Sequence, residues 1–181
     1  MTLHASARSE LERFRPTTPR QALLRDEFRA FLADHSDGVW RSCAPAHITA
    51  SALVVEPARR GLLLVLHRKV GRWLQPGGHC EESDETLPAA ALREAREESG
   101  IEALELVPGV LQVDRHPAPC RPGEVEAHLD VRYLLVAPPG AEPVCSAESA
   151  DVRWFGWDEL PDGIEETIVE MLAAARARLG L

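Results

Sequence analysis

The chain has 181 residues, of which 45% are hydrophobic, an ordinary value for one globular domain with a sizeable core. The formal net charge of −9 at pH 7 argues against a nucleic-acid backbone as the main partner. No apolar run reaches the roughly 18 residues of a membrane span, and the N-terminus lacks the apolar core of a signal peptide. We therefore expect a cytoplasmic protein with neither nucleic acid nor membrane as a partner.

The four cysteines, Cys43, Cys80, Cys120 and Cys145, are widely separated and form no CxxC pair. This spacing argues against structural zinc and against a disulfide framework. Free thiols in a reducing cytoplasm are the expected state.

Residues 1–40 are predicted to form a helical extension. Thr18 is a typical N-cap residue, Pro19 suits the first position of a helix, and Gln21 stands three residues after the cap. Apolar residues then keep helical spacing to about Asp34. The sequence leaves open whether this extra helix covers a sheet edge, contacts a second copy of the chain or shapes a pocket.

Apolar and β-branched segments after residue 40 are predicted to be strands: His47–Glu56, Leu62–His67, Glu105–Asp114, Leu129–Ala137 and Asp151–Trp157. The first two flank a short turn and so indicate a hairpin, and the second is apolar enough to be buried on both faces. A last helix is expected to open at a capping pair, Asp162 and Glu165. Strands segregated from a few helices favour an α/β (α+β) fold with a mixed sheet between helices.

The segment 116–128 contains three prolines and a glycine and is expected to be an irregular loop. Loops of this length inside a compact domain are often functional. His116 and His128 flank the loop, together with Asp130, and are candidate substrate-binding residues. A structural hydrogen-bonding role for these residues is the alternative.

The residues with the clearest chemical pattern lie between Leu74 and Ile101. Pro76-Gly77-Gly78 indicates a tight turn that lets a ligand approach the backbone closely. Thr86 and Gly100 suit the two ends of a helix that is rich in alanine. The local prediction is the end of a strand, a glycine loop and an acidic helix.

Glu94, Glu97 and Glu98 are spaced i, i+3 and i+4, so that they project from one side of the predicted helix. Like charges repel at this spacing, and a bound cation would relieve the repulsion. Mg²⁺ accepts carboxylate oxygens and keeps waters that a phosphate can replace. Taken alone, an acidic helix face is more often a solvated surface.

The residues from Gly78 to Ile101 resemble the Nudix box, G-x5-E-x7-R-E-U-x-E-E-x-G-U, in which U is an aliphatic residue. The part from Glu85 onward matches position by position if Ala95 is accepted as U, and this match favours a metal site over a solvated surface. Six residues separate Gly78 from Glu85 where the pattern has five.

We expect the extra residue to alter the loop and to leave the helical ligands in place, because their relative spacing is unchanged. The loop is expected to bulge near residues 82–84. Glu81, Glu82 and Asp84 are interpreted as solvated loop acids.

The resemblance implies an α/β/α Nudix sandwich over residues 41–181, with a mixed central sheet. It also implies Mg²⁺ or Mn²⁺, and hydrolysis of a diphosphate bond in a nucleoside diphosphate linked to another moiety. Nucleoside triphosphates, ADP-ribose or sugar nucleotides, and dinucleotides all belong to this class. The alternatives are a catalytically silent ligand sensor and a non-nucleotide diphosphate enzyme such as isopentenyl diphosphate isomerase.

Roles for single residues follow from the same resemblance. The metal ligands are Glu94, Glu97, Glu98 and the carbonyl of Gly78, with Glu97 and Glu98 also counted as catalytic. Glu85 and Arg93 would orient these ligands. Glu148 is a candidate general base, because some relatives place an acidic residue in the corresponding loop.

Arg68 and Arg72 lie directly before the glycine loop and are candidates for contact with substrate phosphate. The alternative is that they only end a strand. A homodimer is left open.

Overall fold

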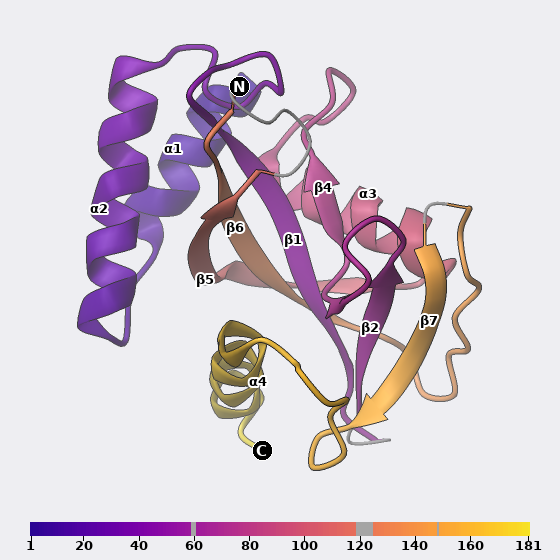
Figure 1. Cartoon of the computed structure of the whole chain (residues 1–181). Helices are drawn as coiled ribbons and strands as arrows, with labels where there is room; N and C mark the ends of the chain where they lie inside the picture. The colour runs from indigo at the N-terminus through magenta and orange to yellow at the C-terminus, as the bar shows by residue number, and fades with distance from the viewer. Residues whose placement is uncertain (59–60, 119–124, 148) are drawn as a thin grey trace.

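The computed structural model describes residues 1–58, 61–118, 125–147 and 149–181 (Figure 1). Its elements, in chain order, are α1 (Leu3–Arg13), α2 (Pro19–Asp34), β1 (Ala46–Glu56), β2 (Gly61–His67), β3 (Trp73–Leu74), β4 (Gly77–His79), α3 (Leu87–Ser99), β5 (Glu105–Pro117), β6 (Ala127–Val136), β7 (Ser149–Gly156) and α4 (Glu166–Leu179). Within these ranges, none of the helices is both long enough and apolar enough to cross a membrane.

The described strands form one mixed sheet, as predicted. Its main order is β3-β2-β1-β6-β5, with β4 paired to β1 and β7 paired to β2. β1 and β6 run parallel, and the expected hairpin of β1 and β2 is antiparallel. The five longest strands coincide with the five predicted segments to within a few residues, whereas the short strands β3 and β4 were not predicted.

Helices pack on both faces of the sheet. Side chains alternate between the two faces along a strand, and β1 shows this clearly. Ala50 and Ala52 pack in a core cluster that includes buried residues of α1, α2 and α3. Leu53 and Val55 belong to a second cluster that includes the buried face of α4. The fold is therefore the expected sandwich, with α3 and α4 on opposite faces (Figure 1).

The N-terminal extension contains two helices rather than the single one expected. The prediction for α2 is confirmed, because the Thr18 hydroxyl accepts a hydrogen bond from the backbone N–H of Gln21. The additional helix, α1, buries Leu3, Ala7 and Leu11 at intervals of four residues. This spacing is helical, but the charged residues between them mask it in the sequence.

Helix α2 closes one edge of the sheet, at β5 (Figure 1). The Gln21 side-chain amide donates to the carbonyl of Val113 and accepts from its N–H, both at 2.8 Å. It therefore takes the place of a neighbouring strand. The division of the chain at residue 40 stays a prediction, since α1 and α2 share a core cluster with the sheet.

Two local expectations are wrong. The segment 116–128 is not irregular at its ends, because β5 and β6 extend into it and pair His116 with His128. The last helix does not open at Asp162. It begins at Glu166, because Gly163 adopts a left-handed backbone conformation (φ 72°) that interrupts a helix.

Candidate active site

Helix α3 places the acidic side chains where the sequence predicted them. Its N-cap, Thr86, accepts from the N–H of Ala89 at 3.3 Å, and Gly100 ends the helix in the left-handed conformation. The buried face is largely alanine, which lets the helix lie close to β1. The carboxylates are left on the side that faces β4 and the loop containing Ser146.

Glu94, Glu97 and Glu98 line one cavity of about 220 Å³ together with Ser146. The Glu98 carboxylate accepts a hydrogen bond from the N–H of Gly77 at 3.0 Å. A Cβ atom at Gly78 would lie only 2.7 Å from the Glu94 carboxyl group, so glycine here lets that carboxylate lie directly against the backbone of β4. Three carboxylates and a closely approaching backbone segment form a set of oxygen donors that suits a hard divalent ion.

Arg93 fixes two of these carboxylates. Its Nη1 donates to Glu94 Oε1 and to Glu97 Oε2, each at 3.0 Å. Its Nε and Nη2 donate to the two oxygens of Asp84, also at 3.0 Å. The hydrogen bond that Arg93 donates to Asp84 is the largest influence that raises the pKa of Arg93, so the guanidinium stays charged. Arg93 thereby connects the glycine loop to the acidic face of α3.

The expectation that Asp84 is a solvated loop acid is wrong. The residue is 9% exposed, and it also accepts the N–H of Glu81 at 2.8 Å, within the turn at residues 82–83. Five residues separate Asp84 from Gly78, so Asp84 stands at the place that the box gives to its first glutamate, and this count was available in the sequence. Glu85 is exposed, and its role in orienting ligands stays a prediction.

The other candidate residues lie in different places. Arg68 donates to the carbonyl of Ser149 at 2.8 Å, beside the segment that contributes Ser146 to the cavity. Arg72 pairs with Glu165, just before α4, at 3.0 Å. Contact of either with phosphate stays a prediction. Glu148 lies outside the described residues, as does Cys120.

A second set of polar side chains forms a buried network on the sheet, and most of its members were not identified from the sequence. The carboxylate of Asp130 accepts from Thr49, Ser51 and Arg132 at 3.0, 2.7 and 2.9 Å. Arg132 also donates to Asp114 at 3.0 Å, and all of these side chains are buried. Polar residues at every second position, 47–49–51 and 128–130–132, are the signal in the sequence that could have revealed this face.

Charge balance holds this network together. Burial alone would raise the pKa of Asp130, but the charges of Arg132 and His116 and the hydrogen bonds it accepts outweigh burial and lower the pKa. Burial likewise opposes protonation of His116, but its hydrogen bond with Asp114 and the charge of Asp130 raise the pKa of that histidine. Arg132 is thus the buried cation that pairs with both carboxylates, and Arg20 and His116 also contact Asp114.

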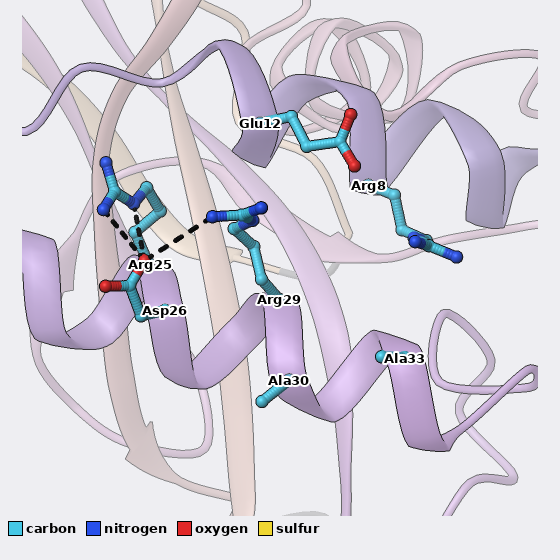
Figure 2. Close-up of a pocket in the computed structure, with 7 residues that line it drawn as sticks. All are labelled: Arg8, Glu12, Arg25, Asp26, Arg29, Ala30 and Ala33. Atoms are coloured by element: carbon cyan, nitrogen blue, oxygen red, sulfur yellow. Dashed lines mark hydrogen bonds and ion pairs between the residues drawn. The ribbon is translucent and has the colours of Figure 1, made fainter.

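A larger cavity, of about 470 Å³, lies between α1 and α2 (Figure 2). Arg25 and Arg29 both pair with Asp26 on their own helix, at 2.8 and 3.8 Å. Arg8 and Glu12 face them from α1. These are ordinary surface pairs of neighbouring helical residues, so we place the candidate active site at the smaller carboxylate cavity.

Comparison with known proteins decides the family. The family model for the NUDIX domain matches residues 45–175, which is well over half of the chain. The chain belongs to the Nudix family. A search of curated protein sequences finds no match.

Solved structures of Nudix proteins are similar to this fold. A NUDIX-family hydrolase from Clostridium perfringens is 26% identical, with a TM-score of 0.58, covering 74% of this chain and 97% of that one. An Ap4A hydrolase from C. elegans is 18% identical, with a TM-score of 0.61 and the same coverages. A UDP-X diphosphatase is 19% identical, with a TM-score of 0.56, and covers 98% of this chain and 90% of its own. The last match covers nearly all of this chain, so it extends to the N-terminal helices.

Proposed function

We propose that this Nudix protein is a metal-dependent hydrolase of a diphosphate bond in a nucleoside diphosphate linked to another moiety. The observation that carries the proposal is the convergence of Glu94, Glu97 and Glu98 on one cavity, with glycine backbone against two of them. These carboxylates, with the carbonyl of Gly78, would hold Mg²⁺ or Mn²⁺. The bound ion would offset phosphate charge and help to generate the attacking hydroxide from water.

The residues of the chain have distinct parts in this proposal. The Glu98 carboxylate accepts a hydrogen bond from the N–H of Gly77, which fixes it beside the first residue of β4. The Glu97 side chain is 58% exposed and is oriented by Arg93, so substrate and water can reach it. We assign Glu97 and Glu98 to catalysis, and Glu148 remains our candidate for the general base. The reaction needs mainly positioning and charge compensation, which helix α3 and the partly buried Arg93 would supply.

The substrate class is supported by what the similar structures are. One is named as an Ap4A hydrolase and another as a UDP-X diphosphatase, and both names describe nucleotides with a diphosphate linkage. A nucleoside triphosphate or a sugar nucleotide fits the same description. The free thiols of Cys43, Cys80 and Cys145 support action in the cytoplasm, where thiols stay reduced.

The test is a phosphate-release screen with Mg²⁺ and Mn²⁺ over dinucleotide polyphosphates, ADP-ribose, sugar nucleotides and nucleoside triphosphates. A phosphatase converts the phosphomonoester products into phosphate, and a pyrophosphatase does so for the pyrophosphate from triphosphates. Isopentenyl diphosphate is included, since its isomerisation without phosphate release would favour the isomerase alternative. Nucleotide binding without turnover would favour the silent sensor.

Matched variants test the site itself. Glu97→Gln and Glu98→Gln should keep the fold and lower turnover by on the order of 10²–10⁴, the range for loss of a positioned electrostatic or acid–base group. Glu102→Gln, an exposed glutamate just beyond α3, is the control and should turn over normally. Turnover within about twofold of wild type in both test variants would defeat the assignment.

A further inference from the structure

Three histidines from separate strands converge on the sheet: His47 from β1, His79 from β4 and His128 from β6. The ring centroid of His47 lies 5.0 Å from the ring centroids of both His79 and His128, and the centroids of His79 and His128 are 5.1 Å apart. One ring nitrogen from each residue lies within 4.8 Å of the other two. His47 is fully buried, and the other two rings are at most partly exposed.

This histidine cluster lies on the opposite face of the sheet from the carboxylate cavity. Gly78 faces Glu94 of α3, and its neighbour His79 must point the other way because strand side chains alternate. The strand register agrees, since His79 pairs with Thr49, whose side chain bonds Asp130 in the buried polar network. The cluster is therefore separate from the site of the proposed hydrolysis.

The surroundings of two of the rings disfavour a charged imidazole, because burial is the largest cause that lowers the pKa of His79 and of His128. Nδ1 of His47 lies 3.3 Å from the carbonyl of Cys43. Such a bond to a backbone carbonyl is how ligating histidines are usually oriented, with the other ring nitrogen left to the metal.

One atom of the cluster lacks any other explanation. Nε2 of His79 is buried and makes no hydrogen bond within the part of the chain that the structure describes. Buried polar atoms are almost always satisfied, so an exception calls for a partner such as an ion. A metal ion among the three rings would supply that partner.

We propose that His47, His79 and His128 bind a transition-metal ion of the zinc type, distinct from the hard divalent ion of the carboxylate cavity. Neutral imidazoles suit zinc, copper and nickel, whereas magnesium prefers oxygen ligands. Zinc–nitrogen bonds of about 2.1 Å in a tetrahedron place ligand atoms about 3.4 Å apart, so the rings need to close by roughly 1 Å. The spacing of the cysteines argued against structural zinc, and this proposed site uses no cysteine.

A bound metal ion would link β1 and β6 to β4, which is only three residues long. The experiment titrates Zn²⁺, and Co²⁺ as a coloured substitute, into the full chain against a chromophoric chelator in excess Mg²⁺. We expect one tight equivalent for wild type. His47→Ala and His128→Ala should each weaken it by more than the roughly 10–100-fold that is typical of losing a supporting residue around a metal.

Two controls separate this proposal from the proposed hydrolase site. His67→Ala removes a histidine outside the cluster, and Glu97→Gln removes a carboxylate, and both should keep wild-type zinc affinity. Zinc affinity that is lost in Glu97→Gln but kept in His47→Ala would overturn the histidine site.

If the alanine variants fail to fold, wild-type crystals grown with Zn²⁺ give the answer by anomalous diffraction at the zinc edge. A peak among the three rings supports the proposal. Its absence there, with or without a peak at the carboxylates, overturns it, whatever the phosphate-release screen finds.

Discussion

Replacement of Asp84 by asparagine should destabilise the protein far more than replacement of its neighbour Glu85 by glutamine. The Asp84 side chain is 4% exposed and that of Arg93 is 19% exposed, and two 3.0 Å hydrogen bonds join them. Breaking a buried ion pair costs about 3–5 kcal/mol. Asparagine keeps one acceptor oxygen, and Arg93 keeps Glu94 and Glu97 as partners, so we expect a loss of about 2–3 kcal/mol. For a chain of this size, that corresponds to a fall of about 4–12 °C in Tm.

The assay is urea denaturation of wild type, Asp84→Asn and Glu85→Gln at pH 7, followed by circular dichroism. Glu85 is exposed, so its variant should stay within about 0.5 kcal/mol of wild type. The slope of the free energy of unfolding against urea should be the same for all three, because none of these changes alters the buried surface much. Equal losses, or a larger loss for Glu85→Gln, would refute the pairing of Asp84 with Arg93 and restore Glu85 as the residue that supports the box.

Two further predictions concern the sheet. Gln21→Leu leaves the N–H and carbonyl of Val113 unsatisfied at a buried edge, so the free energy of unfolding should fall by about 2–4 kcal/mol. Hydrogen exchange at the Val113 amide should become faster. Leu23→Ala, at an exposed position, is the control and should leave the free energy of unfolding unchanged. Asp130→Asn should cost about 3 kcal/mol near pH 7. Because the folded-state pKa of Asp130 is lowered, wild type loses this advantage as the pH falls below about 4. The free energies of unfolding of wild type and Asp130→Asn, measured by urea denaturation, should therefore converge in acid. A difference that stays constant with pH would contradict the network.

The parts of the fold that the sequence predicted correctly depend on local chemistry. Helix α3 was predicted from its cap at Thr86 and its stop at Gly100, and the spacing of its three glutamates follows from the helical repeat alone. The hairpin of β1 and β2 also joins neighbours in the chain. Helix α1 was missed although Leu3, Ala7 and Leu11 carry its period, because its charged residues hide a narrow apolar stripe.

The rest depends on pairing between distant segments, which one sequence does not reveal. His47 and His128 become neighbours only because β1 and β6 pair in parallel in that register. A shift of one residue would send either ring to the other face. Asp84 was misread for a different reason, since the match to the box was aligned on Glu85 although the count from Gly78 points to Asp84. The assigned metal ligands and substrate contacts remain predictions.

The contact between Gln21 and Val113 has a practical consequence for any shortened version of this protein. A fragment trimmed to residues 45–175 would begin after α2 and would expose the backbone of β5 as an unprotected strand. Such an edge is a template on which a strand from another molecule can add, and repeated addition leads to aggregates. We therefore expect helix α2 to keep this edge of the sheet from pairing with other strands, whatever it contributes to the choice of substrate.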